Sequence, residues 1–152
     1  MLVERMMRKI QRAAQLTISD WRYLAKASVE LLAARIRLST VSPERILQEL
    51  QDQSSPLPHE RICRSPPIDV ARLSWAITVA GRCVPWRSDC LIQVMAADRW
   101  LRQHDLCADF HLGVAKDLRG GLRAHAWLRY GDLTVTGGRS DGFAPLIEPP
   151  AK

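Results

Sequence analysis

Two residues in the second half of the chain have side chains suited to nucleophilic catalysis, and the first is Cys90. It lies in the first turn of a predicted amphipathic helix, directly after Ser88 and Asp89, either of which can cap that helix. A helix N-terminus favours the thiolate, the nucleophilic form of cysteine, through its unpaired amides and its dipole. The same amides can hold an oxyanion formed when sulfur attacks a carbonyl carbon. The simpler alternative is that Cys90 is a buried structural thiol.

The second residue is a histidine that could act as the base. His125 begins a predicted strand 35 residues after Cys90. Trp127 follows two residues later and therefore lies on the same side of that strand. A nucleophilic cysteine needs such a base and a third group that orients the imidazole ring. The indole of Trp127 is positioned to shelter a thiolate–imidazolium pair from water.

These residues lie in segments with a family resemblance. "CVPWRSDCLIQVMAADRWLRQHDL" and "FHLGVAKDLRGGLRAHAWLRYGDLTVTGG" resemble the leader peptidases of lasso-peptide biosynthesis, transglutaminase-like (papain-like) cysteine proteases that process microcin-type precursors. The resemblance is closest from about Arg82 to Pro145, and the helical first third is also similar. It implies a Cys-His-Asp triad with Cys90 as nucleophile and His125 as base. It also puts Trp86 in the family motif, where the side chain either lines the substrate cleft or anchors its loop.

The third triad member departs from the family pattern. Family members commonly carry an Asn-Asp pair about twelve residues after the histidine, where this chain has Thr136-Gly137-Gly138. If Tyr130 faces Leu133 across a hairpin turn, antiparallel register puts His125 opposite Gly138. We therefore expect the orienting group to lie near Gly138.

Two aspartates are candidates for that group. Asp132 is in the turn, six steps along a strand from Gly138, or roughly 20 Å away, which is too far. Asp141 lies three residues beyond Gly138, and the two glycines allow the chain to bend back. We expect Asp141 to orient His125, with a backbone carbonyl or another side chain as the alternative.

The elements that must position these residues begin with helices. A stripe of residues at helical spacing predicts one buried face on a first long helix: Trp21, Leu24, Ala25, Ser28, Leu31, Leu32 and Ile36. Ser42-Pro43 starts a short second helix that turns Ile46, Leu47 and Leu50 inward. Residues 51–67, rich in proline and serine, are a predicted surface connector. Asp69 caps a third helix, which buries Val70, Leu73 and Ile77 and ends at Gly81.

Strands follow from residue 108 onwards. Phe110, Leu112 and Val114 alternate with less apolar residues. "HAWLRYGDLTVTGG" predicts a hairpin with a type II′ turn at Gly131-Asp132. Helices that cover a small antiparallel sheet make an α+β fold. We expect one domain over residues 1–152, with a helical part (1–55), a connector and helix (56–81) and a catalytic part (82–146).

Length and composition limit the function further. The 152 residues suit one domain, and the formal net charge of +6 comes mostly from scattered arginines, which suits an acidic peptide, a nucleic acid or simple solubility. The sequence has no secretory signal pattern and no apolar run of about 18 residues, so we expect a cytoplasmic protein. In that compartment Cys63, Cys83, Cys90 and Cys107 should be thiols, and without a C-x-x-C pair we expect no metal site.

The remaining histidines and tryptophans are assigned simpler roles. We expect His59, His104 and His111 to be solvated, and Trp21, Trp75 and Trp100 to lie in the core. Cys63, Cys83 and Cys107 have no patterned partner, so we expect them to be passive.

The sequence therefore predicts a cysteine endopeptidase that cuts the leader from a lasso precursor without metal or cofactor. No glycine-rich phosphate loop is present, so any ATP requirement should belong to a separate cyclase. Residues 1–55 lack a strand-period run, so we expect a separate leader-recognition protein, and neither a nucleic acid nor a membrane as a partner. Two alternatives stay open: a transglutaminase-like acyltransferase, in which an amine replaces water, and a non-catalytic basic module that binds peptide or nucleic acid.

Overall fold

The computed structural model describes residues 16–53, 67–116, 121–138 and 142–147. In these ranges helices come first and strands second: α2 (Ile18–Thr40), α3 (Pro43–Gln53), α4 (Val70–Cys83), α5 (Cys90–Arg102), β1 (Asp109–Lys116), β2 (Leu122–Tyr130), β3 (Leu133–Thr136) and β4 (Ala144–Ile147). The strands form one antiparallel sheet in the order β3-β2-β1-β4. The predicted α+β fold is confirmed.

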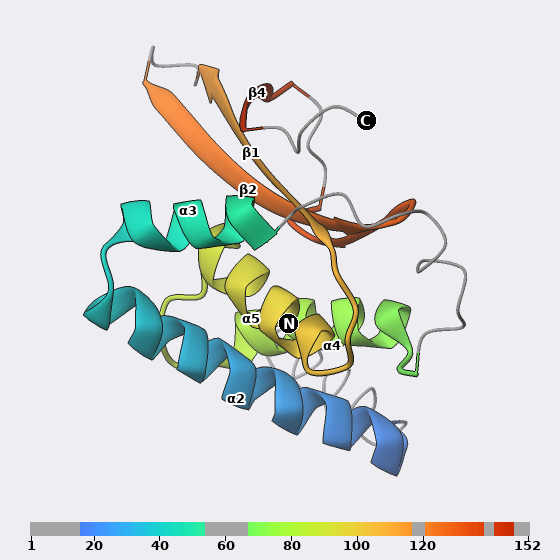
Figure 1. The fold of residues 1–152 in the computed structure, drawn as a ribbon. Helices are drawn as coiled ribbons and strands as arrows, with labels where there is room; N and C mark the ends of the chain where they lie inside the picture. Colours follow the sequence, from blue (N-terminus) through green and yellow to red (C-terminus); the bar gives the residue numbers. More distant parts are fainter. Residues whose placement is uncertain (1–15, 54–66, 117–120, 139–141, 148–152) are drawn as a thin grey trace, which may run out of the picture.

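The molecule is built in layers. Figure 1 shows α4 and α5 between the sheet and α2, with α2 furthest from the sheet. Large apolar side chains from all three layers are fully buried: Leu31 from α2, Leu73 and Ile77 from α4, Ile92 and Leu101 from α5, and Phe110, Leu128 and Val135 from the sheet. Among the described helices, none is long and apolar enough to cross a membrane.

The β2–β3 hairpin agrees with the prediction at its turn and departs from it further along. Tyr130 pairs with Leu133, and Gly131 has a φ of 59°, as a type II′ turn requires at its first central position. A bulge beside Leu128 then shifts the register by one residue, so that Leu128 pairs with Thr136. The expected pairing of His125 with Gly138 assumed an unbroken ladder and is therefore wrong.

The sequence predicts the starts of α3 and α4 correctly but not the end of α4. Pro43 begins α3, and the Asp69 side chain accepts a hydrogen bond from the Arg72 amide at the start of α4. Gly81 does not end α4, which continues to Cys83. A Cβ at Gly81 would lie 3.1 Å from Gln93 Nε2 and from Ser88 Oγ, so this glycine allows the loop before α5 to pack closely.

The buried face of α2 differs from the predicted one. Trp21, Leu32 and Ile36 are exposed, and the buried residues are Ala27, Glu30, Leu31 and Ala34. The helix has two apolar stripes, and the stripe with two alanines packs against α4 and α5 because small side chains let helices approach closely. Trp21 is therefore not a core residue, whereas Trp100 is buried as expected and Trp75 is half-buried.

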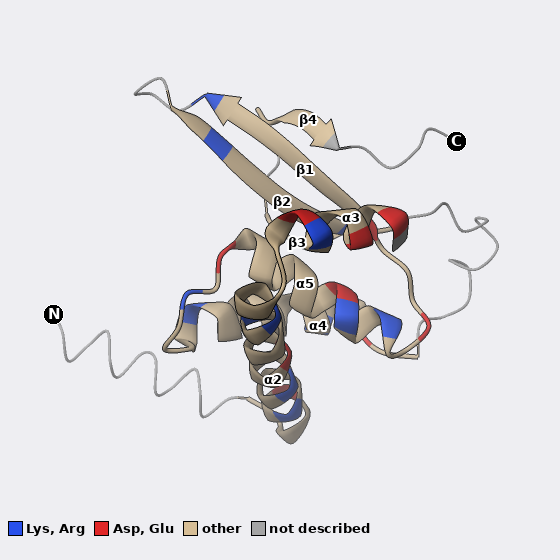
Figure 2. Ribbon diagram, turned by 60° about the vertical axis from the view of Figure 1, so that its left-hand side comes forward, with Lys and Arg blue, Asp and Glu red and all other residues tan. Residues whose placement is uncertain are grey.

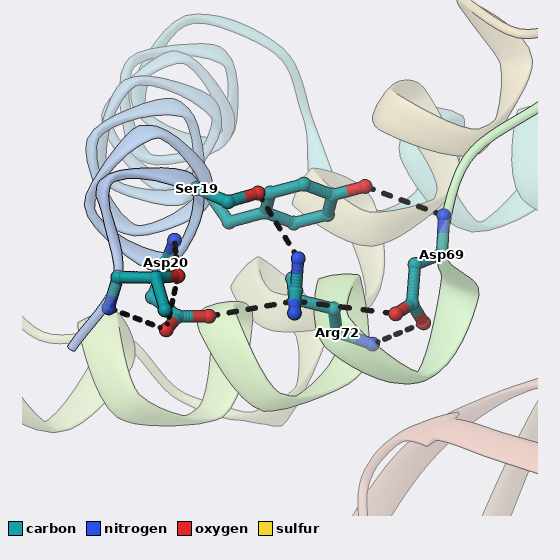
Figure 3. Close-up of polar contacts among 6 residues, drawn as sticks. Ser19, Asp20, Asp69 and Arg72 are labelled. Atoms are coloured by element: carbon teal, nitrogen blue, oxygen red, sulfur yellow. Dashed lines mark hydrogen bonds and ion pairs between the residues drawn. The ribbon is translucent and has the colours of Figure 1, made fainter. Parts of the chain in front are cut away.

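Polar contacts tie the start of α2 to the start of α4 (Figure 3). Thr17 and Asp20 form a capping box, in which the Thr17 hydroxyl accepts from the Asp20 amide and the Asp20 carboxylate accepts from the Thr17 amide. From α4, Arg72 lies 3.4 Å from the same carboxylate and donates to Ser19 Oγ at 3.0 Å. This network joins two helices that lie far apart in the sequence.

Candidate active site

Cys90 is the first residue of α5 and is half-buried against the core between helices and sheet. Asp89 has the N-cap position, but its side chain makes no capping hydrogen bond. Its carboxylate lies 3.7 Å from the Arg87 guanidinium instead, in an exposed ion pair. Among the described residues, no side chain caps the amides of the first turn of α5, and these amides can interact with an anion at Cys90.

One side chain of α5 holds the loop before Cys90. Gln93 Nε2 donates to the Ser88 carbonyl at 2.9 Å, which fixes the last turn of the loop against the helix. Two polar atoms of this loop, Trp86 Nε1 and Ser88 Oγ, are buried and have no hydrogen-bond partner in the described part of the chain. A buried polar atom without a partner is costly for stability, and an ordered water or a bound ligand that reaches these atoms would remove that cost.

His125 is held by a backbone carbonyl. Its Nε2 atom lies 2.7 Å from the carbonyl oxygen of Gly137. A carbonyl can only accept, so Nε2 must carry the hydrogen and donate it. In neutral His125 the lone pair is then on Nδ1, which makes no hydrogen bond to another described residue. The geometry leaves Nδ1 as the ring atom able to take a proton.

Aromatic rings enclose the imidazole. The His125 ring centroid lies 5.9 Å from that of Trp127 and 4.9 Å from that of Phe143. Gly113, which pairs with His125 across the β1–β2 ladder, makes this arrangement possible. A Cβ there would meet Phe143 Cβ at 3.0 Å and Trp127 Cη2 at 3.1 Å. The rings shield His125 from water on two sides.

His111 and Phe143 are part of this cluster and were not predicted to be. His111 was expected to be solvated, but its ring stacks on Trp127 with a centroid distance of 5.4 Å and an interplanar angle of 2°. A signal for His111 existed, because residues that face each other on paired strands share a face of the sheet, and His111 pairs with Trp127. Phe143 follows a segment without a periodic pattern, and the sequence carries no comparable signal for it.

The two proposed catalytic residues lie on elements that pack together, α5 and β2. On β2, Ala126 and Leu128 belong to the core between helices and sheet, so alternation along the strand directs His125 and Trp127 to the other face. Among the described residues, no hydrogen bond joins Cys90 to His125. The structure thus brings His125 together with Trp127, Phe143 and Gly137, and not with Cys90.

Some of the other candidate residues lie in the described part of the chain and some lie outside it. Asp141, His59 and Cys63 lie outside the described residues, so the role of Asp141 stays a prediction. Asp132 is exposed at the hairpin turn, and His104 is partly exposed. Cys83 and Cys107 are free thiols. In the described ranges no three His, Cys, Asp or Glu side chains are grouped so as to hold a metal ion.

A comparison with protein families places most of the chain in a known superfamily. The model of the transglutaminase-like superfamily matches residues 28–148, a range that runs from within α2 to just past β4. It includes Cys90, His125, Trp86, Trp127 and Asp141. No curated protein and no solved structure matches this chain.

Proposed function

This chain belongs to the transglutaminase-like superfamily, and on that premise we propose that it is a cysteine endopeptidase that removes the leader from a lasso-peptide precursor. The superfamily includes cysteine proteases and acyltransferases, and both kinds of enzyme use a thiolate to attack a carbonyl carbon. The motifs around Cys90 and His125 resemble those of the leader peptidases and support the assignment as a leader peptidase within this superfamily.

The observation that carries the proposal is the hydrogen bond between His125 Nε2 and the Gly137 carbonyl. It performs the task that a carboxylate or amide performs in a Cys-His-Asp or Cys-His-Asn triad, since it fixes the ring and its tautomer. A histidine needed only for packing would not require a single orientation with Nδ1 left for proton transfer.

The proposed reaction begins with proton transfer from Cys90 Sγ to His125 Nδ1. The thiolate forms a bond to the scissile carbonyl carbon, and the amides of the first turn of α5 hold the resulting oxyanion. His125 returns the proton to the leaving amine as the C–N bond breaks, and water then hydrolyses the thioester. His125 points away from the face of the sheet that packs on α5, so we propose that substrate binding rearranges these elements and that the Cys90–His125 contact forms only then.

Two tryptophans have proposed roles in binding the peptide. We propose that substrate binding exposes the buried Trp86 indole N–H, which has no partner in the described part of the chain, and that it then donates to a peptide carbonyl beside Cys90. Trp127 is 8% exposed and stacks on His125, so it shelters the imidazolium from water.

The pathway proposed here needs further proteins. The described residues before α4 form helices only, and these residues offer no sheet edge to which a leader peptide could add a strand. We therefore assign leader recognition to a separate protein and macrolactam closure to an ATP-dependent cyclase, all in the cytoplasm. The peptidase step itself uses no metal or cofactor.

Replacing either catalytic residue tests the proposal. Cys90→Ala and His125→Ala should each slow leader cleavage by about a thousandfold or more, because each removes a group that takes part in bond making or proton transfer. The measurement is mass spectrometry of precursor incubated with the purified chain and its leader-binding partner. Cys107→Ala is the matched control, since Cys107 is also a half-buried free thiol. Cleavage by Cys90→Ala at a substantial fraction of the wild-type rate would refute the proposal.

The same assay separates hydrolysis from acyl transfer. With a primary amine added, a peptidase releases the leader as a free acid, whereas an acyltransferase releases it as the amide of that amine. A predominance of the amide at low amine concentration would favour the acyltransferase.

A further inference from the structure

One face of α2 carries an apolar surface that stays exposed in the described part of the chain. It consists of Ile18, Trp21, Ala25, Val29, Leu32 and Ile36, which we call the α2 patch. All six are exposed, from 43% for Leu32 to 82% for Ile18 among the five larger ones. These five are most of the large exposed hydrophobic side chains in the described ranges. Contiguous exposed apolar surface of this kind marks an interaction site.

The spacing of the α2 patch makes it a narrow seam. Successive members are three, four, four, three and four residues apart. At 100° per residue they fall within an arc of about 80°, and at 1.5 Å per residue the seam is about 27 Å long. A seam of this width matches the contact line of a second helix, whereas helices that lie on membranes present a broader apolar face.

The charges beside the α2 patch are all positive. Arg22 and Arg35 are exposed next to the seam and form no ion pair with another described residue. The two acidic residues of α2 lie elsewhere: Asp20 accepts from the helix cap and contacts Arg72, and Glu30 is buried beside Lys26 and Arg99. Figure 2 shows where basic residues (blue) and acidic residues (red) lie along α2. A second copy of this chain would bring arginine-flanked seams together, which disfavours a dimer through α2.

We propose that the α2 patch binds an amphipathic helix of another polypeptide, apolar along one side and flanked by carboxylates. Such a helix would cover the seam and would pair its carboxylates with Arg22 and Arg35. Because α4 and α5 separate α2 from the sheet, a partner bound there leaves His125 and its aromatic cluster accessible (Figure 1). The proposal stands independently of the proposed enzymatic activity.

The test uses the full chain and two synthetic helical peptides of about 18 residues, long enough to span the seam. Both carry leucines at the spacing of the α2 patch, and their flanking positions are glutamate in one and lysine in the other. The glutamate peptide should bind more tightly, by about tenfold or more, and its affinity should fall with added salt. Calorimetry gives both dissociation constants.

Variants of the chain locate the binding surface. Val29→Ser/Leu32→Ser and Arg22→Glu/Arg35→Glu should each weaken binding of the glutamate peptide by about tenfold or more, because they remove the seam or reverse its flanking charge. Leu122→Ser/Leu146→Ser is the matched control, since these two exposed residues lie on the sheet, and it should bind normally. Circular dichroism checks that each variant folds.

Several outcomes would overturn the proposal. Equal affinity for the two peptides would show that Arg22 and Arg35 do not select the partner by charge. Undiminished binding by the two α2 variants would show that the peptide binds at another surface. Sedimentation showing a dimer of the wild type that the Val29→Ser/Leu32→Ser variant loses would assign the patch to a second copy. Patch-dependent binding to vesicles rich in phosphatidylserine, without binding of the glutamate peptide, would assign it to a membrane.

Discussion

In the proposed triad the Gly137 carbonyl orients the His125 ring, a task that a side chain usually performs. Gly137 has a φ of +95°, and a Cβ there would lie 2.4 Å from Trp127 Cβ and 2.8 Å from the Ala126 carbonyl oxygen. Only glycine allows the chain to pass this close to β2 and present its carbonyl to His125. In the proposed triad a backbone acceptor thus stands where the leader peptidases that this sequence resembles commonly carry an Asn-Asp pair.

Gly137→Ala should therefore damage both stability and turnover. We expect a loss of about 3 kcal/mol or more in the free energy of unfolding, from backbone strain and from contact with Trp127, measured by urea titration. Gly138→Ala is the matched control, because Gly138 also has a positive φ, of +61°, but has open space around its Cβ position. It should cost only about 1 kcal/mol and leave cleavage near the wild-type rate. Equal losses in both variants would remove the argument from close approach.

Asp141 and the Gly137 carbonyl are alternative orienting groups. With Nε2 bonded to Gly137 and Nδ1 needed for Cys90, the ring has no further nitrogen for a carboxylate. The rate of leader cleavage by Asp141→Asn decides between them: a rate within a few-fold of wild type supports the carbonyl, and a loss of orders of magnitude assigns the role to Asp141.

At this scale the sequence predicts the identity of reactive residues better than their contacts. Cys90 is singled out by its residue type and by its place at the start of α5. His125 is singled out by its residue type, but the prediction that it begins a strand is wrong, because β2 begins three residues earlier, at Leu122. The contacts of His125 with Gly137 and Phe143 depend on a bulge and on a connection without periodicity, and neither leaves a pattern in the sequence.

Among the elements, the start of α2 gives a prediction about pH. The Thr17 hydroxyl and amide donate to the Asp20 carboxylate, and with Arg72 nearby they hold the pKa of Asp20 below its usual value of 3.8. A lowered pKa means that this carboxylate stabilises the fold above pH 3.8 and loses that contribution as pH falls further.

Asp20→Asn should accordingly be less stable than the wild type at about pH 7, and the difference should shrink at about pH 3. Urea unfolding at the two pH values measures it. Asp132→Asn, in the exposed hairpin turn, is the control and should match the wild type at both values. A difference for Asp20→Asn that persists unchanged in acid would contradict the assigned role of the carboxylate.

The sequence predicts those elements that are determined by residues close to one another in the chain. The alternation of Phe110 and Leu112, the glycine at the hairpin turn and the cap at Asp69 depend only on near neighbours. The buried face of α2 does not, because two apolar stripes compete and the choice depends on what α4 and α5 present. β4 was not predicted because its four residues, with Pro145 among them, show no alternation.

On the scale of the whole molecule, the layers separate two surfaces. The aromatic cluster around His125 lies on the sheet, and the α2 patch lies on the layer furthest from it (Figure 1). Chemistry at the sheet and docking at α2 are therefore compatible in one complex. The formal net charge of +6 does not by itself indicate a partner. In the proposed complex, two of the arginines that contribute to it, Arg22 and Arg35, pair with carboxylates of the bound helix.

The central claim is that Cys90 is a nucleophile activated by His125. The most direct measurement is the rate of iodoacetamide alkylation at each cysteine, resolved by peptide mass spectrometry across pH, in the wild type and in His125→Ala. Cys90 should react faster than Cys107, which is also half-buried, at neutral and mildly acidic pH, and His125→Ala should remove this excess. Equal reactivity of Cys90 and Cys107 in the wild type, or an excess that survives in His125→Ala, would contradict it.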